Sequence, residues 1–192
     1  KGNGSTGYLD TGFTPSTDAV AASAESQTIF AWISELNSDT STSRVGGATG
    51  TVGGRVQLFQ NTHIVATVGA TDNYADQTPT NDTFYSASRN SSSTGASYIN
   101  GGSENTETSL SAASVLVDRS LAILARNQGT YVGHYDGEVS VFGYGASLTS
   151  AEHTALYNAL EKYKTAIEPD PAEEVIAAMT SAPDSTRQGH IE

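Results

Sequence analysis

The clearest strand signal of the chain lies in residues 27–36, QTIFAWISEL. In it, apolar and aromatic residues alternate without interruption at Ile29, Phe30, Ala31, Trp32 and Ile33. Because successive side chains of a β-strand point to opposite faces, this stretch predicts a strand with apolar side chains on both faces. Such a strand lies in the centre of a sheet and is packed on both sides. Trp32 is the only tryptophan of the chain, and we expect it to be packed in the core.

Further short strands are expected at a spacing of roughly 8–12 residues, which is typical of β-sandwiches and β-barrels. The candidates are residues 4–13, 56–59, 63–68, 83–89, 96–100, 113–117, 121–125, 130–134 and 138–144. The glycine-rich residues 46–55 predict turns, and the polar residues 69–82 predict a long loop. The sequence therefore predicts an all-β sandwich or barrel.

One helix is expected in the main body, beginning at Thr149. Thr149 and Glu152 have the spacing of a capping box, in which the two side chains bond free backbone N–H groups of the first turn. The expected packing face repeats every three or four residues: His153, Leu156, Leu160, Tyr163 and Ile167. Pro169 and Pro171 end the helix. We therefore expect a domain over residues 1–167, a proline linker over 168–171 and the start of a truncated helical segment over 172–192, in a piece of a longer chain.

The composition opposes nucleic-acid binding and membrane insertion. Nine Lys and Arg stand against 21 Asp and Glu, for a formal net charge of -12, and the basic residues are scattered along the chain. Phosphate binding needs clustered basic residues, so we expect no nucleic-acid partner. No apolar run approaches the length of a transmembrane helix. The absence of cysteine excludes disulfide staples and a thiol nucleophile.

Sequence motifs of catalysis are absent or lie in the wrong context. Residues 2–7, GNGSTG, match the dinucleotide-binding pattern, but no predicted strand precedes them and a predicted strand follows. Hydrolysis of a glycosidic bond needs two carboxyl groups that face each other. Glu104 and Glu107 are predicted in a polar turn, and Glu138 is alone in its predicted strand. We therefore expect no enzyme and no catalytic residues.

The loop over residues 69–82 carries the first candidate ligand site. Tyr74 has a ring that can stack on a sugar, and Asp72, Asn73 and Asp76 can bind its hydroxyl groups. Asp72, Asp76 and Asp82 also supply the oxygen ligands that calcium prefers, although without the spacing of an EF-hand. An ordinary solvated loop explains the same residues, because Asp and Asn are common in turns. Both interpretations stay open, and no cofactor other than calcium is expected.

Tyr135 and Asp136, next to His134, form the second candidate ligand site. The same chemistry applies, with a ring for stacking and a carboxylate for hydrogen bonds. The alternative is that Tyr135 is an ordinary strand or turn residue, since tyrosine is frequent there. The four histidines lie on different predicted elements and have no metal-ligand spacing: His63, His134, His153 and His190.

Three segments resemble a known family. They are GNGSTGYLDTGFTP at residues 2–15, ASYINGG at 96–102 and GHYDGEVSVFGYGASLTSAEHTALYNALEKYKTAI at 133–167. They are similar to the concanavalin A-like (laminin G-like) jelly-roll domains of phage and prophage virion proteins. The resemblance covers about residues 2–167 and is most specific in the closing strand and helix. It implies a two-sheet antiparallel jelly-roll β-sandwich with one C-terminal surface helix, followed here by a short helical tail.

The resemblance also implies a function. Such domains serve as non-enzymatic, lectin-like adhesion domains on tail fibres or spikes, so the expected location is the virion surface and the expected partner is a host surface glycan. The chain would then be part of a larger assembly, homo-oligomeric or not. Two alternatives stay open: a structural virion domain that makes only protein–protein contacts, and a glycan hydrolase.

Overall fold

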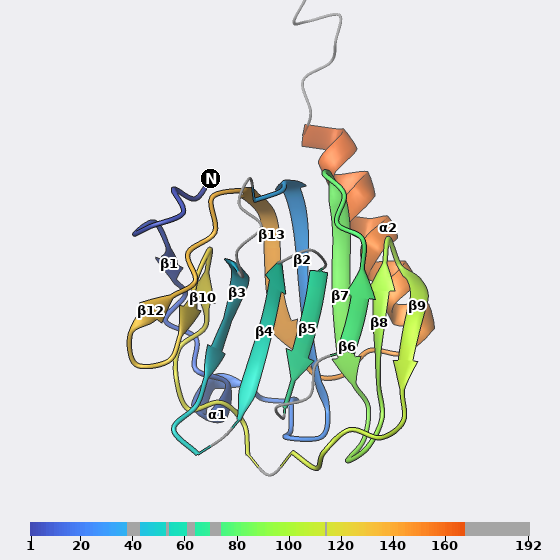
Figure 1. The fold of residues 1–192 in the computed structure, drawn as a ribbon. Helices are drawn as coiled ribbons and strands as arrows, with labels where there is room; N and C mark the ends of the chain where they lie inside the picture. Colours follow the sequence, from blue (N-terminus) through green and yellow to red (C-terminus); the bar gives the residue numbers. More distant parts are fainter. Residues whose placement is uncertain (38–42, 53, 61–63, 70–73, 114, 168–192) are drawn as a thin grey trace, which may run out of the picture. The chain divides into compact units, whose positions relative to one another are not determined.

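The computed structural model describes residues 1–37, 43–52, 54–60, 64–69, 74–113 and 115–167. The chain divides into two compact units, residues 1–158 and residues 159–192. The first unit consists of two β-sheets that face each other across an apolar core, as Figure 1 shows. The second unit begins inside the C-terminal helix.

Thirteen strands and two helices are present in the described part of the chain. The strands of the first sheet are β1 (Leu9–Asp10), β3 (Ser43–Thr49), β4 (Arg55–Gln60), β5 (Ile64–Val68), β6 (Tyr74–Gln77), β10 (Ala122–Ile123), β11 (Arg126–Asn127) and β12 (Tyr131–Val132). The strands of the second sheet are β2 (Gln27–Glu35), β7 (Thr83–Arg89), β8 (Gly95–Ile99), β9 (Gly102–Glu107) and β13 (Glu138–Gly145). The helices are α1 (Pro15–Asp18) and α2 (Ser150–Ile167).

The strand order is that of a jelly-roll sandwich. The eight-stranded sheet has the order β1-β10-β3-β4-β5-β6, and the hairpin β11–β12 joins it through β11 and β3. The five-stranded sheet has the order β13-β2-β7-β8-β9. Neighbouring strands are antiparallel except for β11 and β3. The predicted fold class, a two-sheet β-sandwich with one C-terminal helix, is confirmed.

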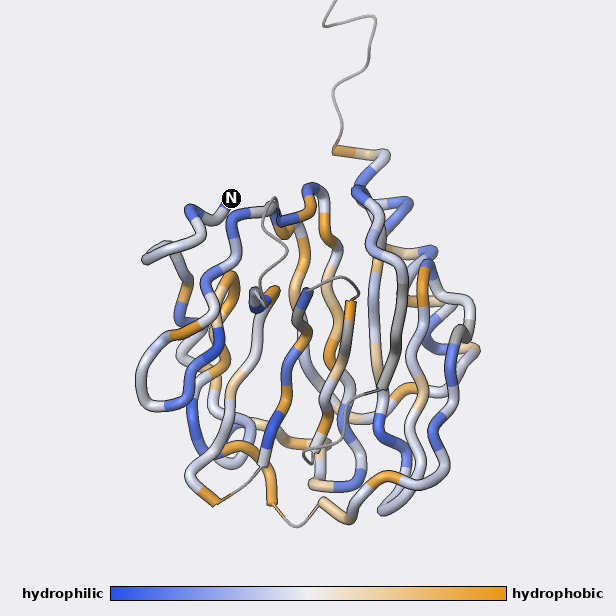
Figure 2. Tube along the Cα trace, in the orientation of Figure 1, coloured by the Kyte–Doolittle hydropathy of each residue, from blue (hydrophilic) through white to orange (hydrophobic). Residues whose placement is uncertain are grey.

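Strand β2 is central, as its alternation predicts. It pairs with β13 on one side and β7 on the other. Ile29, Ala31 and Ile33 are fully buried in the core between the sheets. Trp32 and Phe30 lie on the other face, where their rings contact Phe84 of β7. Strand β4 differs from β2, because hydrophobic and hydrophilic residues alternate along it, as Figure 2 shows.

The first part of α2 covers the outer face of the five-stranded sheet. Tyr157 stacks on Trp32, with ring centroids 5.8 Å apart, and also contacts Phe84. His153 stacks on Tyr98 of β8 with a centroid distance of 3.8 Å. The packing face therefore runs through His153 and Tyr157, so the predicted stripe includes His153 but misses Tyr157. The predicted stripe residues Leu160, Tyr163 and Ile167 belong to the second unit.

The predicted capping box at the start of α2 is confirmed. The Thr149 backbone N–H donates to Glu152 Oε2 at 2.7 Å, and the Glu152 N–H donates to Thr149 Oγ1 at 3.3 Å. These hydrogen bonds also stabilise the charged carboxylate and lower the pKa of Glu152.

Strand β3 corrects the prediction that residues 46–55 form only turns. Gly46 and Gly47 lie inside this strand. These positions are glycine because neighbouring groups leave no room for a side chain. A Cβ at Gly46 would lie 2.4 Å from the Phe142 ring, and a Cβ at Gly47 would lie 2.2 Å from the Val56 carbonyl oxygen. In this strand, glycine permits close packing instead of a turn.

Other predicted boundaries also change. The described residues of 113–117 form no strand, although Ala113 and Val117 are buried. Strands β6 and β9 lie in segments predicted as a loop and a turn, because polar residues with no clear alternation form edge strands here. Only Ala122–Ile123 and Tyr131–Val132 of two longer predicted strands are paired.

The linker over 168–171 and the segment over 172–192 lie outside the described residues, so the predicted domain boundaries stay predictions. None of the helices in the described ranges has the length and apolar character needed to span a bilayer.

Candidate functional site

Two stacked tyrosines lie at the β1 edge of the eight-stranded sheet. Tyr8, just before β1, stacks on Tyr131 of β12 with ring centroids 3.8 Å apart and an interplanar angle of 18°. The hydroxyl group of Tyr131 donates a hydrogen bond to the carboxylate of Asp10. Tyr8 is 44% exposed, so its ring is accessible from solvent. We call Tyr8, Tyr131 and Asp10 the aromatic platform.

Backbone pairing and a tight turn hold the aromatic platform in place. Asp10 pairs with Ala122 of β10, and the next residue, Thr11, donates its N–H to the Leu121 carbonyl oxygen at 3.0 Å. The Gly12 N–H donates to Asp10 Oδ1 at 3.0 Å, with Gly12 at a φ of 69°. The bonds from Tyr131 and Gly12 lower the pKa of Asp10, so this carboxylate stays charged at neutral pH.

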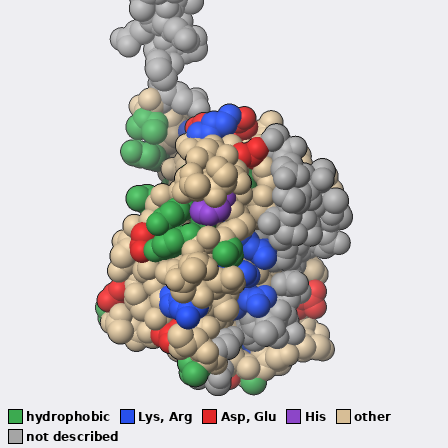
Figure 3. Space-filling model, turned by 60° about the vertical axis from the view of Figure 1, so that its left-hand side comes forward, with side chains coloured by type: hydrophobic (Ala, Val, Ile, Leu, Met, Phe, Trp, Pro, Cys, Tyr) green, Lys and Arg blue, Asp and Glu red, His purple; other side chains and the backbone are tan. Residues whose placement is uncertain are grey.

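A polar hollow of about 230 Å³ adjoins the aromatic platform. Its lining residues are Asn3, Gly4, Ser5, Asn37, Ser43, His134 and Asp136. The ring of His134 lies 6.0 Å from that of Tyr8, so this side chain connects the hollow to the platform. The Nδ1 atom of His134 is buried and has no hydrogen-bond partner. Figure 3 shows hydrophobic side chains gathered next to a histidine on this face.

The N-terminal segment GNGSTG forms one wall of the hollow. Asn3 Oδ1 accepts hydrogen bonds from the N–H groups of Ser5, Thr6 and Gly7 at 3.1, 2.9 and 2.6 Å. Gly2 donates its N–H to the Gly137 carbonyl oxygen at 2.9 Å and has no room for a side chain, because a Cβ would lie 1.6 Å from the Tyr135 carbonyl oxygen. The glycines therefore serve close packing against residues 135–137.

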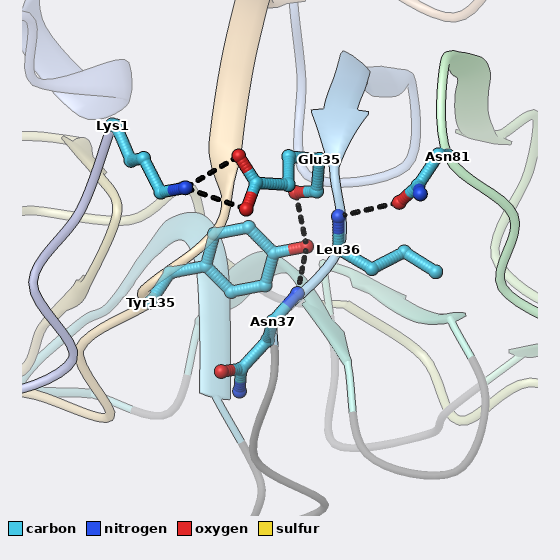
Figure 4. A network of polar contacts seen from close by, with 6 residues as sticks. All are labelled: Lys1, Glu35, Leu36, Asn37, Asn81 and Tyr135. Atoms are coloured by element: carbon cyan, nitrogen blue, oxygen red, sulfur yellow. Dashed lines mark hydrogen bonds and ion pairs between the residues drawn. The ribbon is translucent and has the colours of Figure 1, made fainter.

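The structure corrects the stacking role predicted for Tyr135. This ring is fully buried in the core. Its hydroxyl donates to Gln60 Oε1 at 2.6 Å and accepts the Asn37 N–H at 3.2 Å, the second of which Figure 4 shows. Burial raises the pKa of Tyr135 above its usual value. A buried ring offers no face to a sugar, whereas its neighbours His134 and Asp136 line the hollow.

Glu138 is the only acidic residue of β13, as predicted. It lies opposite Glu35 of β2, and Lys1 donates hydrogen bonds to both carboxylate oxygens of Glu35 (Figure 4). Glu35, with smaller effects from Glu138 and Asp136, raises the pKa of Lys1. The Glu35 carboxylate is thus engaged by an ammonium group. Glu104 and Glu107, predicted in a turn, lie in β9.

The predicted loop site is only partly described. Asp72 and Asn73 lie outside the described residues, and the backbone of Tyr74 and Asp76 lies in β6. Asp82 Oδ1 accepts a hydrogen bond from Trp32 Nε1 at 2.8 Å. No cluster of three or more His, Asp or Glu suited to a metal ion occurs among the residues that the structure describes. Glycan and calcium binding by this loop stay predictions.

Most residues of the platform and the hollow are missing from the sequence prediction. Tyr8 and Tyr131 are 123 positions apart, and only the fold brings them together. The available signal was local: each tyrosine stands near a turn glycine, in GYLDTG and GTYVG.

No family model and no curated protein matches the chain. Solved structures with a similar fold include a NanB sialidase from Streptococcus pneumoniae, with a TM-score of 0.57 and 14% identity over 81% of this chain and 27% of the sialidase. The receptor binding domain of a botulinum neurotoxin mosaic serotype C/D has a TM-score of 0.54 and 13% identity, over 70% of this chain and 36% of that chain.

A third similar structure is an SAP-like pentraxin from Limulus polyphemus, with a TM-score of 0.53 and 12% identity over 72% of both chains. This chain thus spans only about a quarter to a third of the sialidase and toxin chains. At such low identity, the likeness establishes the fold alone. The fold is a jelly-roll β-sandwich.

Proposed function

We propose that this chain is a non-enzymatic, lectin-like domain that binds glycans at the aromatic platform and the adjoining hollow. The observation that carries the proposal is the exposed Tyr8–Tyr131 stack beside a hydrogen-bonded carboxylate. Sugar rings bind to proteins by stacking an apolar face on an aromatic ring, while polar side chains bind the hydroxyl groups. The platform and the hollow supply both kinds of group side by side.

The hollow supplies the polar partners in this proposal. Asp136 offers a hydrogen-bond acceptor, whereas Asn3 and Asn37 shape the wall of the hollow, because their amide groups already bond Thr6 and Ser43. His134 stands between the platform and the hollow, with a buried Nδ1 that lacks a partner. A bound sugar that extends from the platform would meet these groups in turn.

The wider role that we propose is adhesion: the domain belongs to a phage tail fibre or spike, lies on the virion surface and binds a glycan of the host. The family resemblance of residues 2–167 supports this role. The similar structures are compatible with it, because one of them is a receptor binding domain of a neurotoxin. Their binding residues are not transferred, since binding loops differ freely within a fold.

A glycan array with the whole chain tests the proposal. We expect at least one glycan to bind, and Tyr8→Ala to weaken that binding about tenfold or more, as is usual for a central aromatic contact. Tyr163→Ala is the matched control, because it removes another exposed tyrosine, on α2. Binding that survives Tyr8→Ala would contradict the proposed site.

The same array, repeated with a chelator, tests the predicted calcium ion. Loss of binding on chelation, reproduced by Asp72→Asn or Asp76→Asn, would support calcium at that loop. An array without any bound glycan would contradict the proposed function. It would favour a structural virion domain, whose protein contacts should bury about 1,200 Å² or more.

A further inference from the structure

Three arginines gather on the outer face of the eight-stranded sheet. They are Arg44 of β3, Arg55 of β4 and Arg126 of β11, and all three are half-buried. We call them the arginine cluster. The chain has a net charge of -12, yet no carboxylate of a described residue lies within ion-pair distance of Arg55 or Arg126. The cluster is therefore a basic surface on an acidic protein.

A floor of buried polar side chains supports the cluster. Arg126 donates from Nη1 to Gln57 Oε1 at 3.1 Å, and Gln57 Nε2 donates to Thr67 Oγ1 at 3.2 Å. Gln57 is 1% exposed and Thr67 is fully buried. Gly47 permits this arrangement, because a Cβ there would lie 2.7 Å from Gln57 Cβ. Arg126 is thus fixed in place instead of extending freely into solvent.

The cluster is held at an energetic cost. The Nε atoms of Arg55 and Arg126 are buried without a hydrogen-bond partner. Burial, together with the charges of Arg126 and Arg55, lowers the pKa of Arg44 to about 10. A fold is destabilised by like charges that are held close together and by buried donors that have no hydrogen-bond partner. Both features are typical of sites that bind a ligand. A bound anion would remove both costs.

The cluster adjoins the proposed glycan site. The Arg44 N–H donates to the Gly133 carbonyl oxygen at 2.6 Å, one residue before His134. Figure 3 shows Lys or Arg side chains near the hydrophobic side chains and the histidine on this face.

We propose that the arginine cluster binds the carboxylate or sulfate group of an acidic glycan whose neighbouring sugar lies on the aromatic platform. Guanidinium groups suit both anions, because they form charge-assisted and often bidentate hydrogen bonds. The inference rests on the proposed function and adds the substrate class to it. At physiological salt the remaining acidic residues are screened beyond about 8 Å, so their net charge does not prevent local binding of an anion.

Titration calorimetry with three probes tests the inference on the whole chain. The probes are oligogalacturonate for the carboxylate, oligosaccharides of dextran sulfate for the sulfate, and carboxyl-reduced oligogalacturonate as the neutral match of the first. We expect at least one acidic probe to bind about tenfold or more tightly than the neutral one, with an affinity that falls as salt is added.

Variants then locate the anion. Arg55→Gln and Arg126→Gln should each weaken binding of the acidic probe about tenfold and leave the neutral probe unchanged. Arg126→Lys keeps the charge and should restore part of the affinity. Lys162→Gln is the control, because it removes the same charge from a residue outside the cluster. Thermal unfolding of each variant shows that it is folded.

The outcomes separate the two proposals. If glycans bind but acidic and neutral probes bind equally, or if both glutamine variants keep full affinity, the inference is overturned and the proposed function stands. If acidic probes bind and Tyr8→Ala has no effect, the cluster is retained and the aromatic platform is overturned. If no probe and no arrayed glycan binds, both are overturned.

Discussion

The outer faces of the two sheets are built from different side chains. The five-stranded sheet presents Trp32 and Phe84 to Tyr157 of α2, and Tyr98 to His153 of the same helix. The eight-stranded sheet presents Arg44, Arg55 and amide side chains, which are half-buried or supported from below. One face is packed with aromatic rings, whereas the other carries arginine side chains.

The difference suggests separate roles for the two faces: the helix-covered face contributes to the stability of the fold, and the arginine face serves the proposed ligand binding. A face that is closed by a helix contributes through apolar burial and contacts between aromatic rings. A face that holds several like charges gains little from them in the free protein. Changes on the helix-covered face should therefore alter the free energy of unfolding, and changes on the arginine face should alter ligand affinity.

The largest effect is expected from Phe84→Ala. The Phe84 ring is fully buried and contacts Phe30, Trp32 and Tyr157. Its removal leaves a cavity under α2, so we expect a loss of about 3–5 kcal/mol in the free energy of unfolding, measured with urea. Tyr8→Ala, at an exposed ring of the other sheet, should cost less than about 1.5 kcal/mol. Equal losses would contradict the proposed division between the faces.

The second largest effect is a dependence of the free energy of unfolding on pH, and it is caused by His153. This fully buried ring lies between Ser86 Oγ, 2.8 Å from Nδ1, and Ser88 Oγ, 2.7 Å from Nε2. Burial lowers the pKa of His153 to about 4 from its usual 6.5. Between these values the unfolded chain binds a proton and the folded chain does not, so stability falls as the pH falls.

The expected loss is about 2–3 kcal/mol between about pH 7 and about pH 4.5. His153→Gln should remove this part of the pH dependence, and the difference between the two unfolding curves isolates it from the titration of carboxylates. A wild type and a variant with parallel pH profiles would contradict this, because they would show that the pKa of His153 is the same in the folded and the unfolded chain.

The sequence predicts the packed face far better than the binding face. Strands β2 and β7 are predicted almost to the residue, because alternating apolar residues mark strands that are buried on both sides. Strand β3 is missed because its glycines serve the packing of Phe142 and Gln57, which are distant in sequence. A local sequence pattern identifies a strand. Whether a position in that strand requires glycine depends on residues that are close in space but distant in sequence.

The candidate site shows the same limit. The segment around Tyr135 is predicted as a binding segment, and its flanking residues His134 and Asp136 do line the hollow. Which of three consecutive residues points inward depends on register, and that is fixed by pairing with distant segments. The Tyr8–Tyr131 stack and the arginine cluster each combine residues from several strands, so no local pattern could reveal them.

A smaller effect is expected at the start of the helix that closes the packed face. Thr149→Ala removes the Oγ1 acceptor of the Glu152 N–H and so weakens the capping box. The expected loss is about 1 kcal/mol in the free energy of unfolding, and Thr149→Ser should restore most of it. If both variants are equally destabilised, the methyl group rather than the hydroxyl group is responsible.

The smallest effect on stability is expected from Arg55→Gln. This substitution removes a like charge from the arginine cluster and breaks no ion pair with a described residue, so the free energy of unfolding should stay within about 0.5 kcal/mol of the wild type. Urea unfolding at low salt, where repulsion is least screened, gives the most sensitive measurement.

Arg89 provides the contrasting arginine. It is fully buried and donates hydrogen bonds to the carbonyl oxygens of Val68, Ser91, Ser92 and Ser111. Arg89→Gln should therefore destabilise the fold by about 3 kcal/mol or more, because it leaves buried acceptors unpaired. A comparable loss at Arg55 would make that residue a structural arginine of the same kind. A neutral Arg55→Gln that loses the acidic glycan would show that the charge is kept for the ligand, since the fold does not depend on it.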